Sequence, residues 1–264
     1  MSTQGPGNTA PNQGEASPKV SSPVEEDPEA TARASAAAGR LYSGQCSSDR
    51  ALERYGRLIE AGIDVFGTQG YANAKIKTLC QRAGLSERYF YESFESREEL
   101  LTAVYDLLAT SMLASAKAAF KAPAKNLMAS VKAGTGEVVD FMLGDPRHAR
   151  IILVEIVGIS PELEAKRHQS LNNFADVTMY QLLLLCGTPL REAQERLAAH
   201  PEDHALAAVL DFARLTAVSV VGGVNNMLLD SLHSGTVHNT QGILDVSCQL
   251  ISNAALSIRA VAEK

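Results

Sequence analysis

The sequence predicts an all-α fold of about nine helices, and three observations lead to this prediction. Apolar residues recur at spacings of three and four along most of the 264-residue chain, as they do on one face of a helix. Strand-like alternation of useful length is missing from the sequence. No internal repeat of about 20–50 residues recurs, which argues against a solenoid or a propeller.

The composition is that of a soluble protein with ample material for a core. Hydrophobic residues make up 45% of the chain and charged residues 20%, and the mean hydropathy is −0.05. No stretch approaches the roughly 18 uninterrupted apolar residues of a membrane span, and the N-terminus lacks the pattern of a secretory signal. The cysteines at 46, 80, 186 and 248 show no CxxC pair and no metal-ligand spacing. We therefore expect reduced thiols, no metal, no membrane contact and a cytoplasmic location.

Changes in composition along the chain predict three segments. Residues 1–46 are rich in Gly, Pro, Ala and Ser and lack apolar periodicity, which predicts a disordered arm. Residues 47–95 are expected to form a small helical domain whose first helix begins near Ser47. Residues 96–264 are expected to form a larger helical domain that ends in two long apolar helices.

The net charge of −6 is unevenly distributed. Residues 1–49 carry three basic and six acidic side chains, residues 50–101 carry eight of each, and residues 102–264 carry 13 basic against 16 acidic. The middle segment is thus the least acidic part of the chain without being basic. Binding of a polyanion there would depend on the placement of individual Arg and Lys side chains, because no polycationic surface is available.

The stretch Ala74–Leu101 has the pattern of a helix-turn-helix. It reads AKIKTLCQRAGLSERYFYESFESREELL, in which Gly84 interrupts a first short helix and Ser86 begins a second one. Ser96 followed by Glu99 forms a capping box at the start of a much longer helix. In proteins built this way, the second short helix enters a DNA groove.

The segment from Arg50 to Leu101 resembles the DNA-binding domain of TetR-family transcriptional regulators, in register and without a gap. The matching positions are Phe66, Gly67, Gly70, Tyr71, Leu79, Cys80, Ala83, Gly84, Leu85, Ser86, Tyr91, Phe94, Ser96, Arg97, Leu100 and Leu101. The resemblance implies a helical effector-binding and dimerisation domain, and a homodimer that assembles through the two C-terminal helices. It also implies a palindromic double-stranded DNA operator and a small-molecule effector, usually one that releases a repressor. The composition of the larger domain favours an apolar or amphipathic effector.

The predicted recognition helix, Ser86–Ser93, and its surroundings supply the candidate DNA contacts. The candidates are Lys75, Lys77, Ser86, Glu87, Arg88, Tyr89, Tyr91, Glu92 and Arg97. Ser86 is expected to cap the helix, whose amide groups favour a nearby phosphate. The resemblance assigns phosphate contacts to Tyr91, Arg97 and the two lysines, while the remaining candidates lie on the exposed side of the helix.

Arg88 has two interpretations that the sequence leaves open. A bidentate contact to guanine would contribute about 1–3 kcal/mol of discrimination. The alternative is a phosphate contact or a salt bridge with Glu92 one turn on. Glu87 and Glu92 either accept from cytosine amino groups or remain solvated. Phe90 and Phe94 are expected to hold the recognition helix against the first helix.

Several positions depart from the family pattern. Ala74 stands where the family often has Thr, so a hydroxyl for a cap or a phosphate contact is missing. Arg97 replaces the commoner Lys, which preserves the charge. Arg88 and Tyr89 occupy positions that are often Gly and Thr, which gives a bulkier and more polar face toward the groove.

Aromatic and methionine side chains of the larger domain are the candidates for an effector site. The candidates are Phe120, Met128, Phe141, Met142, Phe174, Met179, Asn226 and Met227. Such residues are more often core than ligand contacts. Asn225 and Asn226 interrupt an apolar helix and need polar partners, in a ligand or across a dimer interface. Gly222 and Gly223 permit close helix approach, which favours the interface.

Other motifs carry little chemistry. His200 and His204 in HPEDH have the spacing of a metal pair on a helix, but Pro201 between them and the lack of a third ligand favour a solvated loop. No nucleophile elbow, HExxH or dinucleotide fingerprint is present, so we expect no enzyme activity and no cofactor. The alternatives to a repressor are a regulator that activates, and an all-helical interaction module that does not bind DNA.

Overall fold

The computed structural model of the chain describes residues 28–234 and 239–263. These residues form ten α-helices and no strand, which confirms the predicted all-α class. Contacts divide the chain into two compact units, Met1–Arg50 and Ala51–Lys264. The helices are α1 (Pro28–Gln69), α2 (Ile76–Ala83), α3 (Glu87–Tyr91), α4 (Arg97–Lys121), α5 (Leu127–Gly144), α6 (Pro146–Arg150), α7 (Pro161–Cys186), α8 (Leu190–Ala199), α9 (His204–Ser234) and α10 (Thr240–Ala262), with a 3-10 turn η1 (Tyr71–Asn73) and a π-helical segment η2 (Ile151–Glu155).

Helix α1 begins at Pro28, well before the start expected near Ser47. The expectation was based on apolar periodicity, which the sequence ATARASAAA at residues 30–38 lacks. Alanine is the strongest helix former even without such periodicity, and proline suits a first helical turn. The expected arm, residues 1–46, is thus helical from Pro28 onward, and its residues 1–27 lie outside the described part of the chain.

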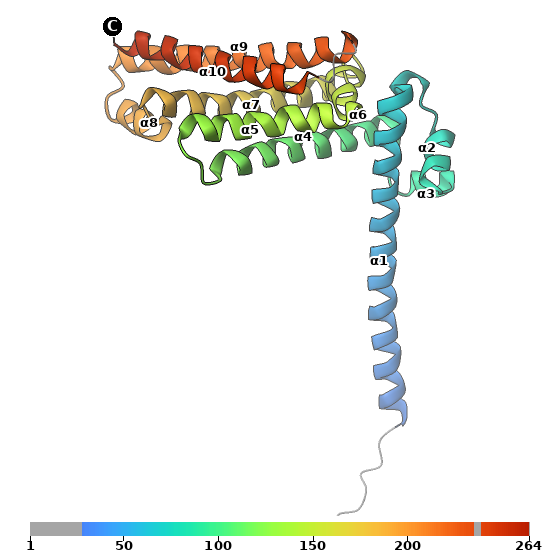
Figure 1. Cartoon of the computed structure of the whole chain (residues 1–264). Coiled ribbons are helices and arrows are strands. Elements are labelled where there is room, and N and C mark those ends of the chain that lie inside the picture. The colour runs from blue at the N-terminus through green and yellow to red at the C-terminus, as the bar shows by residue number, and fades with distance from the viewer. Residues whose placement is uncertain (1–27, 235–238, 264) are drawn as a thin grey trace, which may run out of the picture. The chain divides into compact units, whose positions relative to one another are not determined.

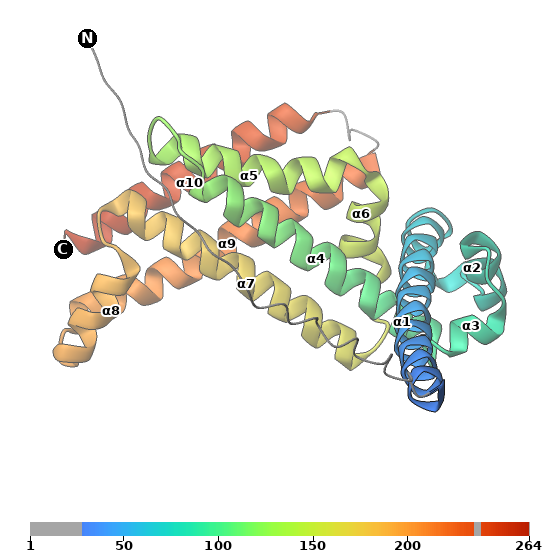
Figure 2. The ribbon, with the colours of Figure 1, turned by 90° about the horizontal axis from the view of Figure 1, so that it is seen from below.

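Five long helices form the body of the larger domain (Figures 1 and 2). Helix α5 packs on α4 and α10, α7 packs on α9 and α10, and α9 packs on α10. The short α8 lies at the end of this bundle that is far from α6 (Figure 1). Helix α6 lies at the opposite end, where the bundle meets α1.

The helix-turn-helix shares its core with the larger domain. One hydrophobic cluster contains fully buried residues from α1, α2, α3, α4 and η2, namely Phe66, Leu79, Phe90, Leu100 and Ile151. A second cluster lies among α5, α7, α9 and α10. Burial of each such side chain contributes about 1.5–3 kcal/mol. The first cluster thus connects η2 with the helix-turn-helix.

Three helices begin at residues whose side chains cap them, among them the predicted Ser96. The side chains of Ser96, Asp145 and Ser160 accept hydrogen bonds from backbone N–H groups of the first turns of α4, α6 and α7, at 3.1, 3.1 and 3.3 Å. Each oxygen satisfies a donor that has no partner within its helix.

The buried segment after Asp145 changes its helical winding within a few residues. The α-helical turn of α6 changes to the π-helical winding of η2 at Ile151. Ile151 and Ile156 are fully buried, whereas Val157 is half exposed. An apolar run that is buried all round is compatible with either winding, so the sequence pattern could not predict the π-helix.

Candidate functional site

A left-handed turn joins α2 to α3. Gly84 has φ +63°, a conformation that glycine adopts without steric cost. Arg57 of α1 holds this turn, because its Nε donates to the carbonyl of Ala83 at 2.9 Å and its Nη2 donates to the carbonyl of Gly84 at 3.0 Å. The exposed carbonyls at the end of α2 are thereby capped by a cation.

Two phenylalanines anchor the recognition helix α3, as predicted. Phe90 and Phe94 are buried, and their ring centroids lie 5.9 Å apart. The ring of Phe94 stacks on Tyr55 of α1 with a centroid distance of 5.0 Å. Anchoring of one side of α3 leaves its opposite side exposed.

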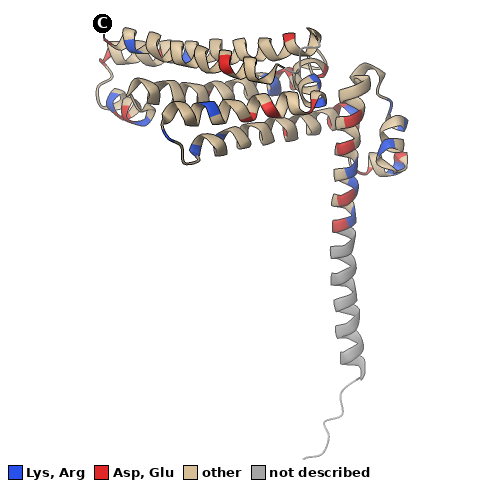
Figure 3. Cartoon of the chain, viewed as in Figure 1, with Lys and Arg blue, Asp and Glu red and all other residues tan. Residues whose placement is uncertain are grey.

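The exposed side of α3 presents most of the predicted DNA contacts. Glu87, Arg88, Tyr89 and Tyr91 are exposed, as are Lys75 and Lys77 at the start of α2. Figure 3 shows both signs of charge in this part of the molecule, as the neutral local charge of the sequence implied.

The expected cap at the start of α3 is not formed. Ser86 occupies the N-cap position, but its hydroxyl accepts no hydrogen bond from the helix. The α-helix itself is limited to Glu87–Tyr91, which is shorter than the predicted Ser86–Ser93. The free hydroxyl of Ser86 remains exposed beside the first amides of α3.

Glu92 is paired with two arginines. Its carboxylate lies 3.1 Å from Nε of Arg88 and 3.7 Å from Nη2 of Arg54. The guanidinium carbon of Arg54 also lies 4.6 Å from the ring centroid of Tyr89. The side chain of Arg88 is 84% exposed, so its pair with Glu92 is worth only about 0.3–0.5 kcal/mol. In the free protein Arg88 thus forms a salt bridge with Glu92, which is one of the two interpretations left open by the sequence. Breaking this salt bridge would cost little free energy.

Arg97 is occupied within the protein. Its Nη1 donates to the carbonyls of Tyr71 and Ala74 at 3.1 and 2.6 Å, and its guanidinium carbon lies 4.5 Å from the ring centroid of Tyr71. These contacts fix the turn η1 and the start of α2. The sequence resemblance assigned a phosphate contact to this residue and did not indicate this internal role.

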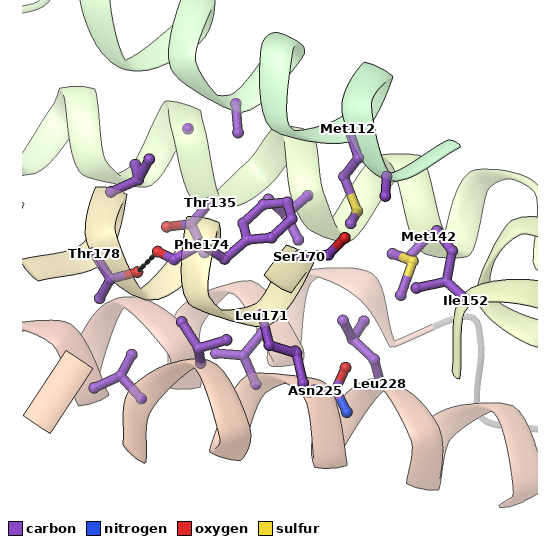
Figure 4. A pocket seen from close by; sticks show the side chains of 18 of the residues that line it. Met112, Thr135, Met142, Ile152, Ser170, Leu171, Phe174, Thr178, Asn225 and Leu228 are labelled. Atoms are coloured by element: carbon purple, nitrogen blue, oxygen red, sulfur yellow. Dashed lines mark hydrogen bonds between the residues drawn. The ribbon is translucent and has the colours of Figure 1, made fainter. Parts of the chain in front are cut away.

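A mostly apolar cavity of about 110 Å³ lies inside the larger domain, between α4, α5, α7, α9 and α10. Figure 4 shows Met112, Met142, Phe174 and Leu228 around the same space. Ile152 of the π-helical segment η2 also lines it. None of the lining residues carries a charge.

Only part of the predicted effector set lines this cavity. Met142 and Phe174 do so. The others have different surroundings: Phe120, Met128 and Met179 pack against the second core cluster, Phe141 stacks on His148, and Asn226 and Met227 line a separate shallow groove. Asn225 lines the cavity and Asn226 does not, because consecutive residues on a helix point about 100° apart.

Sequence reasoning missed Gln181, a polar residue of the cavity wall. It is 6% exposed and lines the cavity. Thr135 and Ser170 add hydroxyl groups to the wall. Burial raises the pKa of the Tyr105 phenol, and a hydrogen bond with Ser170 opposes that shift. A polar residue within the apolar run YQLLLLC was the same kind of signal that singled out Asn225.

The two C-terminal helices expose apolar side chains in the single chain. Helix α9 is long and apolar enough to cross a membrane by length and composition alone, and only 22% of its most apolar window is buried. The exposed residues are Phe212, Leu215 and Val218 on α9 and Val246, Leu250 and Leu256 on α10. Exposed apolar side chains on two helices that pack together are typical of an interface.

Two sequence comparisons identify relatives. Residues 58–104 match the family model described as bacterial regulatory proteins, tetR family. The HTH-type transcriptional activator FasR from Mycolicibacterium smegmatis is 27% identical over 114 residues, which are 43% of this chain and 52% of FasR. The matched stretch thus spans about half the length of that curated relative.

Solved structures share the fold. The fatty acid degradation regulator FadR from Bacillus halodurans has 16% identity and a TM-score of 0.59, over 75% of this chain and 94% of its own. A transcriptional regulator from Rhodococcus sp. has 18% identity and a TM-score of 0.57, over 75% and 95%. FadR from Bacillus subtilis, solved in complex with stearoyl-CoA, has 15% identity and a TM-score of 0.51, over 73% and 97%. At these identities the likeness concerns the fold.

The sequence match covers the helix-turn-helix, and the shared fold extends through the helical domain that holds the cavity. The matched family consists of regulatory proteins rather than enzymes. Residues 58–104 are therefore similar to the tetR family of regulatory proteins, and the chain shares the fold of the solved regulators.

Proposed function

We propose that the chain is a ligand-responsive, DNA-binding transcriptional regulator that acts as a homodimer. The observation that carries this proposal is the exposed side of α3, where Arg88, Tyr89 and Tyr91 project while Phe90 is buried. Such an arrangement presents hydrogen-bonding groups to a major groove from a rigid support. The protein would act in the cytoplasm, where bacterial DNA is found.

The exposed apolar faces of α9 and α10 support a homodimer through the C-terminal helices. Two-fold symmetry would place the two α3 helices in successive major grooves, about 34–36 Å apart, on a palindromic operator. The weak pairing of Arg88 with Glu92 would leave Arg88 available for a base or a phosphate of that operator.

The effector is proposed to bury an apolar, uncharged part in the cavity. A buried carboxylate or phosphate would lack a cationic partner among the lining residues, and burial of an unpaired charge is costly. Gln181 would donate to or accept from a neutral polar group such as an ester, thioester or amide. A related fold binds stearoyl-CoA, so an acyl chain attached through a thioester is the first effector to test.

The regulator is proposed to be a repressor that the effector releases from DNA. The alternative is activation, which the name of the relative FasR favours. A reporter gene under an operator that the protein selects would separate the two. Deletion of the regulator should raise expression if it represses and lower it if it activates.

The proposal is tested by selecting genomic fragments with the purified full-length protein and measuring binding to them. We expect a palindromic sequence to be enriched, with log affinity falling linearly in log salt by about 0.9 for each phosphate contact. Addition of stearoyl-CoA, with stearate and CoA as controls, should weaken binding. A protein that selects no sequence would be an interaction module instead of a regulator.

A further inference from the structure

The backbone of the turn before α2 is held by a side chain from the larger domain. The N–H of Tyr71 donates to Oε2 of Glu155 at 2.7 Å, although the two residues are 84 positions apart. The Glu155 side chain is only 11% exposed. A carboxylate in such surroundings forms a strong, directional hydrogen bond to a backbone amide.

Arg150 fixes the position of this carboxylate. Its Nε donates to Oε1 of Glu155 at 2.8 Å, and its Nη1 donates to the carbonyl of Thr68 at the end of α1, also at 2.8 Å. Gly70 lies directly against the pair, since a Cβ there would come within 2.9 Å of Arg150 and 3.1 Å of Glu155. The end of α1 and the turn thus rest on Arg150 and Glu155.

The helical segment that carries Glu155 also contributes a residue to the wall of the cavity. Glu155 is the last residue of η2, and Ile152, three residues earlier, lines the cavity with 8% of its surface exposed. The π-helix is a rare winding that is found disproportionately at functional sites. One short segment therefore touches the cavity at Ile152 and the helix-turn-helix at Glu155.

The Tyr71 peptide is also held from its other side. Its carbonyl accepts from Arg97, the first residue of α4, and Arg97 additionally binds the carbonyl of Ala74 just before α2. The orientation of this turn therefore sets where α2 starts. Helix α3 follows α2 through the turn that Arg57 holds.

We propose that Glu155 is a positioning residue that links the state of the cavity to the orientation of the helix-turn-helix. A change in the packing of Ile152 moves η2 and shifts the position of the Glu155 carboxylate relative to the Tyr71 amide. The hydrogen bond between Glu155 and Tyr71, which helps to fix the start of α2, is then weakened. The regulatory role of Glu155 rests on the proposed function, but the contact between Glu155 and Tyr71 can be tested without DNA or effector.

The test is hydrogen exchange of the Tyr71 amide in the full-length protein, measured by NMR. Ile152→Ala removes side-chain atoms from the cavity wall on η2. Ile251→Ala makes the same truncation in the same cavity, but on α10. None of the hydrogen bonds that join Tyr71, Glu155, Arg150 and Thr68 involves α10. We expect Ile152→Ala to speed Tyr71 exchange about threefold or more relative to Ile251→Ala. Equal rates in the two variants would overturn the proposal.

Substitution of the carboxylate gives a second measurement. Glu155→Ala should speed Tyr71 exchange about tenfold, because it removes the acceptor. Glu155→Gln keeps an acceptor oxygen and should restore part of the protection. In Glu155→Ala, Ile152→Ala should then have no further effect on Tyr71, and an additional effect would show that the cavity acts through another route.

DNA affinity separates the failure of this proposal from the failure of the proposed function. On an operator selected by the wild type, Ile152→Ala should change affinity more than Ile251→Ala. If the wild type selects no operator, the proposed function fails while the exchange data still decide the role of Glu155. If an operator is bound and the two variants bind it equally, the linking role of Glu155 is wrong.

Discussion

Arg97 lies with its guanidinium carbon 4.5 Å from the ring centroid of Tyr71 and donates to the carbonyl of the same residue. This relationship makes Arg97 a structural residue of the turn, in addition to any phosphate contact. We expect Arg97→Ala to lower the free energy of unfolding by about 2–3 kcal/mol, from lost charged hydrogen bonds and cation–π stacking. Urea unfolding checks this. A residue that contacts only phosphate would leave stability unchanged and weaken DNA binding alone.

Arg97→Lys is the matched variant for the same site. Lysine keeps the charge, and hence the long-range attraction to phosphate, but lacks the planar fork that reaches two carbonyls and stacks on a ring. We therefore expect Arg97→Lys to lose most of the stability that Arg97→Ala loses. Wild-type stability in Arg97→Lys would show that the charge alone matters at this position.

Arg88→Ala should relax sequence preference with little effect on folding. Its pair with Glu92 is exposed, so removal should change stability by less than about 0.5 kcal/mol. Loss of a bidentate base contact should reduce discrimination at one base pair by about 1–3 kcal/mol, measured by binding to a set of single-base operator variants. Arg191→Ala is the control, since Arg191 forms an even more exposed pair with Glu195 on α8. Uniform weakening on all operators would indicate a phosphate contact instead.

The features predicted from sequence are those that depend on neighbours along the chain. The helix-turn-helix spacing, the cap Ser96 and the anchors Phe90 and Phe94 all follow from residues within a few positions of each other. Local rules of capping and periodicity are sufficient for such features.

The features that sequence reasoning missed depend on contacts between distant segments. Arg97 meets carbonyl groups 23 and 26 residues away, and Glu155 meets an amide 84 residues away. Which residues line the cavity depends on how each of five helices is rotated about its own axis. The apolar periodicity of the sequence defines these rotations only roughly, so it could not show that Asn225 lines the cavity rather than Asn226, or that Gln181 does. Three-dimensional packing, and not local propensity, decides these assignments.

Two glycines with left-handed backbones give a matched pair for the role of the α2–α3 turn. Gly84 and Gly187 have φ values of +63° and +77°. At Gly187 nothing lies within 4 Å of an added Cβ. Gly187→Ala should therefore lower the free energy of unfolding by only about 1–2 kcal/mol, the cost of a left-handed backbone for alanine. At Gly84 the Cβ would lie 2.6 Å from Nη2 of Arg57, so Gly84→Ala should also displace that arginine.

Urea unfolding and operator binding together check this pair. Both variants should be less stable than the wild type, and Gly84→Ala should be the less stable of the two. Only Gly84→Ala should lose operator affinity, because only this substitution disturbs the turn that positions α3. Equal loss of affinity in Gly187→Ala would mean that the effect comes from general destabilisation.

Asp145 should contribute to stability in a pH-dependent way. Hydrogen bonds from the Arg147 side chain, with Nε and Nη2 at 2.9 and 2.6 Å, hold the pKa of the Asp145 carboxyl below its ordinary value of 3.8. Because the folded-state pKa is the lower one, this contribution is complete above about pH 4 and is lost as the pH falls through the folded-state value. Asp145→Asn should therefore flatten the loss of stability as the pH falls below about 4.

Chemical unfolding at a series of pH values checks the prediction for Asp145. Asparagine still caps a helix, so Asp145→Asn should keep α6 intact at neutral pH. Asp140→Asn, on the exposed side of α5, is the control and should retain the acid slope of the wild type. An unchanged slope in Asp145→Asn would assign acid sensitivity to other carboxylates.

The apolar face of α9 and α10 predicts the effect of a charge on assembly. Leu215 on α9 is 68% exposed in the single chain, and a two-fold interface would bury it in both subunits. Leu215→Lys should therefore weaken the dimer by about 3–6 kcal/mol, or about a hundredfold to ten-thousandfold in Kd. Light scattering at micromolar protein should change from about twice the chain mass of 28.1 kDa toward that mass itself. Leu107→Lys on α4, at a leucine that is 46% exposed, should leave the dimer intact, and a monomeric wild type would contradict the assignment of this face.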